Sequence, residues 1–445
     1  MPRFFKPQKS QSKKPIRIEE PLLIEHLSDD GRGIAHYHGK IVFVEGALEG
    51  ERAQVRVTHT SSRFLEAKAV SIEQVSPQRV APQCRHADSC GACSVQYMSQ
   101  AQQLAFKEAA IAKQLQQQAQ QSSVNTITTL FDEPYAYRNR IRLGVSVDKK
   151  GHVSLGFRQK QSQQLVNISE CPVMLPVLSQ LIQPLYQWLC TLSHAPVTHI
   201  ELMGQAESFG VLIRHTRPLN SHNKLELKHS MLALGAQLWF QPDKNGGLED
   251  DNGTKVDPRL SYTLIDGLRL YYHPQDFIQA NPVINAKMIE QALSLLNPKL
   301  DEHFADLFCG IGNFSLPLSK HVATVHGVEG VQTMVERAAA NAAANGCTNT
   351  HFTQANLADK EAKVYDMPPV NGLLMDPPRS GAKVICENIH RLAPQRIAYI
   401  SCNTATLARD AHILCEKGYQ LTASGLMDMF PQTAHSEAMC LFARS

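Results

Sequence analysis

The stretch "DLFCGIGNF", Asp306 to Phe314, joins a short apolar run to a glycine-rich turn. The run "HFADLF" predicts a buried strand, and the residues after the turn predict the start of a helix. Gly310 and Gly312 fall where the strand gives way to the helix. Glycines at such a turn let the backbone approach a ligand closely, because no Cβ stands in the way. The third glycine of a dinucleotide fingerprint is absent, so an α/β domain with ordinary turn glycines is the alternative.

From about Tyr271 to residue 445, short apolar runs alternate with helical stretches. The runs are "HFADLF", "TVHGV", "GLLM" and "RIAYIS", and the stretches between them include "VQTMVERAAAN" and "TLARDAHILCEKG". This alternation is typical of βαβ units around a parallel sheet. The sequence therefore predicts a Rossmann-like α/β domain over residues 271–445.

Polar residues follow three further strands of this predicted sheet. Glu329 lies in "GVEG", Asn356 in "QAN" and Asp376 in "LLMDPPR". The carboxyl ends of parallel strands share one edge of a sheet, where open α/β sheets bind ligands. A carboxylate at Glu329 is placed to accept hydrogen bonds from ribose hydroxyls. Together with the glycine loop, these features look like a class I S-adenosylmethionine-dependent methyltransferase domain.

Cys402, in "YISCNTATLARD", follows the fifth apolar run and precedes a helical stretch. Most such cysteines are buried thiols that fill space. The alternative is a nucleophile: a thiolate that adds to C6 of a pyrimidine makes C5 reactive toward a sulfonium methyl, and a base must then remove the C5 proton. His435 and Glu437 are the candidate bases. The thiol pKa would need lowering, and the start of the following helix is positioned to do this.

Four cysteines in the first half of the chain form a second candidate site. Cys84, Cys90 and Cys93 have C-x5-C-x2-C spacing, and Cys171 is a distant fourth member in "SECPV". Zinc and a [4Fe–4S] cluster both accept four thiolates, so spacing alone leaves both open. Unconnected structural cysteines are the remaining alternative.

The rest of the chain predicts a multidomain protein. Residues 1–15 form a basic tail, a disordered arm or a segment that follows a phosphate backbone. Residues 16–75 read as short alternating strands of a small OB-like β-barrel, either RNA-binding or purely structural. Residues 80–270 predict a mixed α+β region that carries the cysteines. The 445 residues include eleven cysteines and no apolar run long enough to cross a membrane, so we expect a cytoplasmic protein, and a monomer.

Six ordered motifs closely resemble the RNA (uracil-C5)-methyltransferase family. They are "DFIQAN", "DLFCGIGNFSLPL", "GVEG", "DPPRSGA", "SCNTATLARD" and "MDMFPQTAHSE". The resemblance covers most of the chain and makes the barrel resemble a TRAM domain. The barrel and the four cysteines point to the branch that methylates 23S rRNA. Another rRNA or tRNA uridine, and a non-catalytic RNA-binding assembly factor, are the alternatives.

The resemblance implies a role for each matching residue. Cys402 matches the nucleophile and Glu437 the base, while Phe277 matches a surface on which a flipped base stacks, although a core phenylalanine is the alternative. Cys84, Cys90, Cys93 and Cys171 match the ligands of a [4Fe–4S] cluster. The positions that contact S-adenosyl-L-methionine are Gln279, Phe308, Asn313, Glu329, Asn356 and Asp376. One departure is Thr404, where the family usually has proline, so the rigidity of the nucleophile loop is in question.

Overall fold

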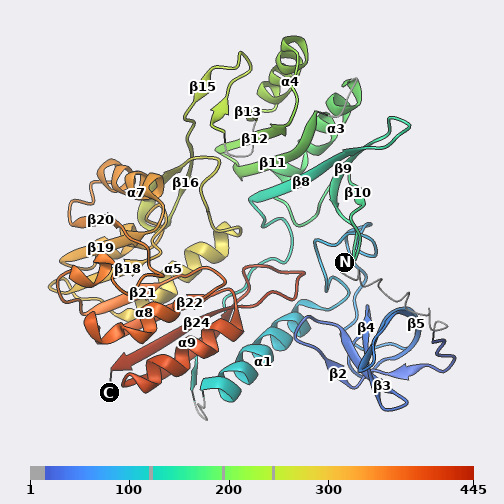
Figure 1. The fold of residues 1–445 in the computed structure, drawn as a ribbon, viewed down its shortest axis with the longest axis horizontal. Helices are drawn as coiled ribbons and strands as arrows, with labels where there is room; N and C mark the ends of the chain where they lie inside the picture. The colour runs from blue at the N-terminus through green and yellow to red at the C-terminus, as the bar shows by residue number, and fades with distance from the viewer. Residues whose placement is uncertain (1–15, 120–123, 193–195, 243–245, 445) are drawn as a thin grey trace, which may run out of the picture. The chain divides into compact units, whose positions relative to one another are not determined.

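The computed structural model describes residues 16–119, 124–192, 196–242 and 246–444, so the basic tail expected at 1–15 lies outside the described residues. The chain divides into two compact units, residues up to 81 with 97–102, and residues 82–96 with 103 onward. The first is blue in Figure 1, and each unit is described by itself. Within the described residues, no helix has both the length and the apolar character that a membrane span needs.

The first unit is a six-stranded sheet that closes on itself. Its strand order is β1-β5-β6-β4-β3-β2, with β4 and β6 parallel and the other pairs antiparallel. β1 and β2 are consecutive parts of one segment, yet they pair with opposite edges of the sheet, which makes a barrel. The strands are β1 (Leu22–Leu23), β2 (His26–Leu27), β3 (Gly33–Tyr37), β4 (Lys40–Glu45), β5 (Arg52–Thr60) and β6 (Phe64–Gln74).

Alternate residues of these strands fill the barrel, as their two-residue periodicity predicts. Val42, Val44 and Leu65 are fully buried within its core. Arg52 and Arg56 are exposed on the outer face of β5. The small OB-like barrel expected at this end of the chain is therefore confirmed.

The second unit contains two large sheets. The central sheet has the order β10-β9-β8-β11-β12-β13-β14-β15, and all pairs except β12–β13 are antiparallel. Its strands are β8 (Arg140–Val147), β9 (Val153–Arg158), β10 (Leu165–Asn167), β11 (Val197–Gln205), β12 (Ser208–His215), β13 (Gln237–Gln241), β14 (Leu248–Glu249) and β15 (Lys255–Val256). The segments between these strands contain α2 (Pro176–Ser179), α3 (Ile182–Thr191) and α4 (Ser221–Ala233), of which α3 and α4 are labelled in the green part of Figure 1.

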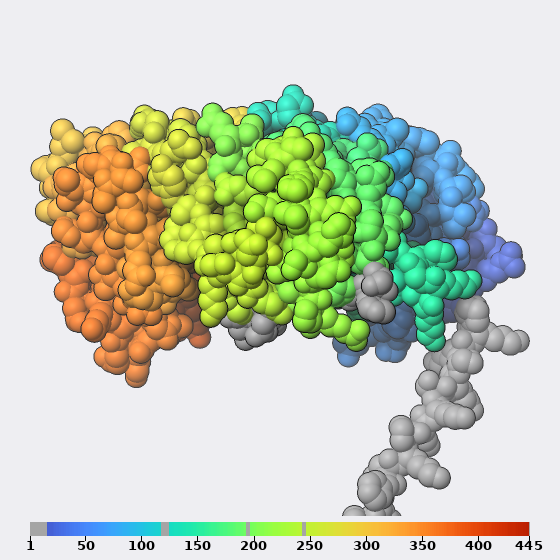
Figure 2. Space-filling model, turned by 90° about the horizontal axis from the view of Figure 1, so that it is seen from above, coloured from blue at the N-terminus to red at the C-terminus, as the bar shows by residue number. Residues whose placement is uncertain are grey.

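A hairpin connects the central sheet to the C-terminal sheet. It consists of β16 (Leu260–Thr263), a single 3-10 turn at Ile265–Gly267 and β17 (Arg269–Tyr272), and α5 (Pro282–Leu296) follows it. Leu260 and Leu270 of the hairpin share one apolar core with Met203 of the central sheet and Phe304 of the C-terminal sheet. In the space-filling view of Figure 2, yellow-green and yellow residues lie between the green and the orange parts of the surface. The two sheets of this unit are therefore packed together through the hairpin.

The C-terminal sheet has the order β20-β19-β18-β21-β22-β24-β23-β7. β18 to β22 are parallel, β24 runs antiparallel to its neighbours, and the order reverses between β18 and β21. The strands are β18 (His303–Leu307), β19 (Thr324–Glu329), β20 (Thr350–Gln354), β21 (Gly372–Met375), β22 (Arg396–Ser401), β23 (Tyr419–Met427), β24 (Glu437–Arg444) and β7 (Asn125–Thr126). The predicted Rossmann-like domain is confirmed.

Helices pack on this sheet, as the apolar faces of both layers require. Following the strands, they are α6 (Ser315–Ser319), α7 (Gln332–Ala344), α8 (Lys383–Glu387) and α9 (Thr404–Glu416), with single 3-10 turns at Lys363–Asp366 and Ile389–Arg391. α1 (Gln100–Ala119), from far earlier in the chain, also joins the core of this sheet through Ile111 and Leu115. The C-terminal sheet is thus completed by α1 and β7, two elements that precede the central sheet in sequence.

Candidate active site

The glycine loop lies at the carboxyl end of β18, where the strand order reverses. Gly310 and Gly312 have φ angles of +57° and +96°, in the left-handed region. A Cβ at Gly312 would lie 2.5 Å from Cδ1 of Leu316. Phe308 also has a positive φ, +64°, although it is not glycine. The two glycines therefore allow the left-handed backbone that this loop requires.

Glu329 ends β19 and holds the glycine loop against it. Its Oε2 accepts a hydrogen bond from Gly310 N at 3.1 Å, while its Oε1 accepts from Gly330 N at 2.8 Å and from Val331 N at 3.1 Å. Each carboxylate oxygen has further lone pairs with which to accept a ligand hydroxyl. This arrangement suits the ribose-binding role implied for Glu329.

The other residues expected to bind the methyl donor lie on neighbouring loops. Gln279 Nε2 donates to Asp376 Oδ2 at 3.0 Å, which joins the segment before α5 to the end of β21. Asn313 exchanges two side-chain hydrogen bonds with Asn285 of α5, at 2.8 and 3.0 Å. Asn356 is exposed after β20, and its Oδ1 accepts from Ala358 N. The structure thus brings Gln279 to Asp376, while Asn313 and Asn356 bond to other partners along the same edge of the sheet.

Asp306 is a polar residue of this edge to which the sequence argument gave no role. It is fully buried at the end of β18, and its Oδ2 accepts from Ser315 Oγ at 2.5 Å. Its Oδ1 has no hydrogen-bond partner among the described residues. Burial, and then the nearby Asp376 and Glu329, raise the pKa of Asp306 to about 7. The sequence does contain a signal for Asp306, because a carboxylate inside the apolar run "HFADLF" is unusual.

These carboxyl groups suit a cationic ligand. Burial raises the pKa of Asp376 to about 7 as well, against the hydrogen bond from Gln279. S-Adenosyl-L-methionine carries a sulfonium cation, which favours the ionised form of nearby carboxyl groups. A pocket is lined by Tyr262, Ile278, Gln279 and Asn285, among others, and includes the glutamine that donates to Asp376. The buried Oδ1 of Asp306 and this donor set therefore fit the methyl donor.

Cys402 lies between the end of β22 and the start of α9. Asn403 caps the helix, and its Oδ1 accepts from Ala405 N and Thr406 N. Asn403 Nδ2 and Thr406 Oγ1 both donate to the carbonyl oxygen of Arg379, at 3.1 and 3.2 Å. The loop after β21 is thereby fastened to the loop that carries Cys402, even though Thr404 replaces the proline expected there.

Glu437 begins β24, the antiparallel neighbour of β22. The register pairs Ser401 with Ala438, so Cys402 and Glu437 lie at the same end of the two strands. The Glu437 side chain is buried, with 7% of the residue exposed. Burial, and secondarily Asp376, raise the pKa of Glu437 to about 8, and Lys107 and Arg379 oppose the rise. The structure thus brings together Cys402 and Glu437, which lie in different sequence motifs.

The pKa of the Cys402 thiol is raised, not lowered. Burial is the main cause, Glu437 and Asp376 add to it, and Arg379 opposes it. The expectation that the helix start lowers this pKa is wrong for the free protein, mainly because the thiol is buried and secondarily because two carboxyl groups lie near it. Burial also lowers the pKa of His435, as do nearby cations including Arg379 and Lys107. His435 therefore lies in the same environment but favours its neutral form.

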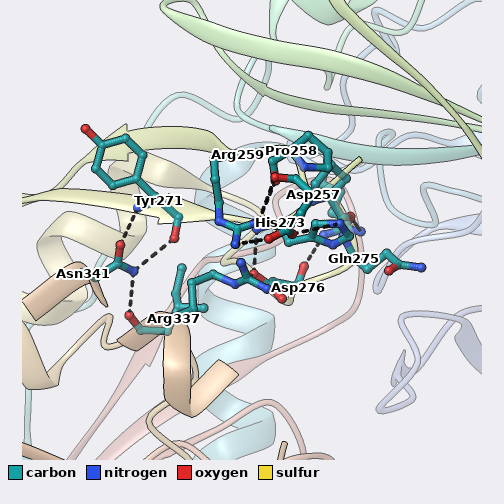
Figure 3. Close-up of polar contacts among 12 residues, drawn as sticks. Asp257, Pro258, Arg259, Tyr271, His273, Gln275, Asp276, Arg337 and Asn341 are labelled. Atoms are coloured by element: carbon teal, nitrogen blue, oxygen red, sulfur yellow. Dashed lines mark hydrogen bonds and ion pairs between the residues drawn. The ribbon is translucent and has the colours of Figure 1, made fainter. Parts of the chain in front are cut away.

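Phe277 is presented by a rigid turn. Its residue is 67% exposed, between the buried Asp276 and Ile278, so it is not a core phenylalanine. Figure 3 shows Arg337 of α7 directed at Asp276, with Arg337 Nε 2.5 Å from Asp276 Oδ2. Asp276 Oδ2 also accepts from His273 N at 2.7 Å. The exposed ring therefore stands on an anchored backbone.

Asn341, one turn further along α7, connects the hairpin to the glycine loop. Its Oδ1 accepts from Tyr271 N at 2.9 Å, and its Nδ2 donates to Tyr271 O at 3.0 Å, as Figure 3 shows. The same Nδ2 donates to Ile311 O at 3.1 Å. α7 thus supports both the segment that carries Phe277 and the loop expected to bind the donor.

The four cysteines of the central region gather around the end of β9. Cys90 forms an isolated bridge with Gln159, and Cys171 N donates to Ser179 Oγ at 3.2 Å. Burial raises the pKa of Cys93 to about 11 and that of Cys171 to about 12, and in both cases the other cysteines add to the rise. Among the described residues, no three His, Cys, Asp or Glu side chains converge tightly enough to hold a metal ion. The thiols are therefore neighbours in this part of the fold.

Comparisons with known proteins agree with this geometry. The family model described as tRNA (Uracil-5-)-methyltransferase matches residues 262–445, and the TRAM domain model matches residues 16–70. Among solved structures, the Pyrococcus abyssi tRNA (uracil-54, C5)-methyltransferase, in complex with S-adenosyl-L-homocysteine, has a TM-score of 0.73. That similarity covers 95% of this chain and 99% of the other at 22% identity, and it shows the shared fold.

Full-length relatives are more similar in sequence. A protein of Photobacterium profundum named 23S rRNA (uracil(1939)-C(5))-methyltransferase RlmD is 38% identical, over 100% of this chain and 97% of its own. A Pseudomonas entomophila protein of the same name is 41% identical, over 96% and 94%. The chain therefore belongs to the RNA (uracil-C5)-methyltransferase family, as an S-adenosylmethionine-dependent enzyme with an N-terminal TRAM domain.

Proposed function

We propose that this enzyme methylates C5 of a uridine in 23S rRNA, at the site equivalent to the uracil 1939 that its relatives are named for. Identity of about 40% along the whole chain supports this substrate, as does a TRAM barrel with Arg52 and Arg56 exposed. Such a substrate implies action in the cytoplasm, and we expect a monomer.

One observation carries the proposed mechanism: Cys402 and Glu437 lie at the same end of two hydrogen-bonded strands, with Asp376 beside both. The Cys402 thiolate forms a bond to C6 of the uracil, and the π electrons of C5=C6 shift toward C5 and the C4 carbonyl. When bound, S-adenosyl-L-methionine would supply an electrophilic methyl group to C5, with its S–CH3 bond breaking to leave S-adenosyl-L-homocysteine. Glu437 then accepts the C5 proton, the C5=C6 bond reforms, and the sulfur leaves as thiolate.

Other residues of the edge hold the reactants. Gln279, Phe308, Asn313, Glu329, Asn356 and Asp376 are proposed to contact the methyl donor. Phe277 offers an exposed face on which an extruded base can stack, because a base inside folded RNA must leave its stack to be reached. The turn fixed by Asp276 and Arg337 keeps that face in place.

We further propose that Cys84, Cys90, Cys93 and Cys171 hold a [4Fe–4S] cluster. Other cysteines of the set contribute to the raised pKa of Cys93 and of Cys171, which supports a group of neighbouring thiols, and four thiolates are the donor set of such a cluster. Zinc accepts the same four thiolates, so the metal content has to be measured. Bound there, the cluster would cross-link residues 84–93 to Cys171. Anaerobic purification should give a brown protein with about four irons per chain, whereas a colourless zinc protein contradicts this assignment.

The experiment that tests the function follows tritium release from 5-tritiated uridine during methylation. A 23S rRNA fragment that contains the 1939 region should release tritium with the wild-type enzyme and should not with Cys402→Ala. Glu437→Gln should stop at a methylated covalent adduct that survives denaturing electrophoresis. Cys190→Ala, at an exposed thiol, is the matched control. Release by Cys402→Ala rules out the mechanism, and preference for a tRNA over the rRNA fragment rules out the substrate.

A further inference from the structure

The loop between β23 and β24 leads into Glu437. The last strand pair before it is Met427 with Glu437, so residues 428–436 form the connection that sets where the base begins. Gln432, in the middle of this loop, has a φ of +68° and is 3% exposed. A non-glycine residue in the left-handed region persists only where its surroundings determine it strongly. The contacts of Gln432 therefore identify what holds the loop.

Gln432 is held on three sides by residues from the first quarter of the chain. Gln103 of α1 donates from Nε2 to Gln432 Oε1 at 3.0 Å, and Gln103 Oε1 accepts from Gln432 N at 2.9 Å. Gln432 O accepts from Ser94 N at 3.0 Å and from Val95 N at 3.2 Å. Gln103 is 1% exposed, so this exchange takes place away from water. These bonds fix the directions of the side-chain Oε1, the backbone N and the backbone O of Gln432.

The rest of the loop is held by the same elements. Lys107, one turn after Gln103 on α1, places its Nζ 2.6 Å from Asp428 Oδ1 and donates to Phe430 O at 3.0 Å. Ala434 N donates to Ser94 Oγ at 3.0 Å, and Tyr137 OH donates to Pro431 O at 3.0 Å. The loop is thus fastened at both ends and in the middle.

This arrangement matters because a general base must lie within hydrogen-bond reach of the proton it removes. A displacement of the order of 1 Å at a catalytic group can cost about a hundredfold in rate. We infer that Gln103 and Gln432 are positioning residues that set Glu437 for removal of the C5 proton. The inference rests on the proposed function, in which Glu437 is the base. It assigns to α1, an element outside all six motifs, a part in one chemical step.

The test separates that step from the steps before it. In single turnover with S-adenosyl-L-methionine and 5-tritiated RNA, the methylated covalent adduct and the released tritium are measured together. Gln103→Ala should form the adduct at the wild-type rate and release tritium at least tenfold more slowly, so that the adduct accumulates. Gln432→Ala removes the bond that Gln432 Oε1 accepts but keeps the bond from the Gln432 backbone N, so it should slow tritium release in the same direction but less; this gives a second result if Gln103→Ala does not fold. Gln116→Ala, at an exposed glutamine of α1, is the matched control.

A purely structural role predicts a different pattern, in which adduct formation and tritium release fall together or neither changes. Either result in the folded variants overturns the inference. Glu437→Gln is run beside them as the reference for a missing base. If Glu437→Gln releases tritium normally, the proposed function fails; if only the glutamine variants behave like wild type, the inference fails alone.

Discussion

The pH dependence of proton removal is the sharpest consequence of the buried Glu437. Its pKa is raised to about 8, mainly by burial, and only the ionised carboxylate can accept the C5 proton. The ionised fraction is then about one tenth at pH 7 and about nine tenths at pH 9, so the rate of this step should rise about tenfold between them and level off above. The rate rises with pH because the pKa of Glu437 is raised. A glutamate with an ordinary pKa would be ionised throughout this range, and the rate would not change with pH.

Adduct formation complicates a simple pH profile, because the raised pKa of the Cys402 thiol also favours high pH. The measurement should therefore begin after Cys402 has already bonded to the ring. Methylated adduct is formed by rapid mixing, the pH is jumped to values between 6 and 10, and tritium release from the adduct is followed. Adduct made by Glu437→Gln provides the background rate. A flat rate between pH 7 and 9, or one that falls, refutes the assignment of a raised pKa to the acting base.

Three further changes test how the site is built. Lys107→Met leaves the fully buried Asp428 without its cation and should lower the free energy of unfolding in urea by about 3–5 kcal/mol, whereas adding Asp428→Leu should restore most of it. Thr404→Pro falls at the first position of α9, where proline is favoured, and should raise the unfolding free energy by about 0.4–1 kcal/mol with methylation unchanged; a loss of stability contradicts the helix start described. Gly312→Ala puts a Cβ 2.5 Å from Leu316 Cδ1 at a φ of +96°, and should weaken S-adenosyl-L-methionine binding at least tenfold by calorimetry, whereas unchanged affinity separates the loop from the donor site.

The C-terminal fold was predictable because its signals are local. The run "HFADLF" becomes β18, and "RIAYIS" becomes β22 residue for residue. Apolar runs of this length between helical stretches admit few other arrangements. The position of Glu329 and Asp376 at strand ends followed from the same pattern, because parallel strands present their carboxyl ends at one edge.

Contacts between distant segments were not predictable in the same way. Periodicity shows that one face of α1 is apolar, but it does not say that Lys107 meets Asp428, 321 positions away. Nor does a two-residue strand such as β7 have any pattern of its own before it pairs with β23. The pKa of Cys402 illustrates the same limit, because the helix start is local whereas Glu437 and Asp376 reach the thiol through sheet topology.

The carboxyl groups around the thiol also suggest why the steps occur in order. Asp306, Asp376 and Glu437 have raised pKa values, and the last two raise that of Cys402. A cation bound among these groups stabilises their ionised forms and lowers every one of these pKa values. Before the cation binds, the proposed nucleophile and base both tend to keep their protons, so attack on a uracil is disfavoured. Binding of a cationic methyl donor and ionisation of the proposed nucleophile and base are thus parts of one electrostatic change.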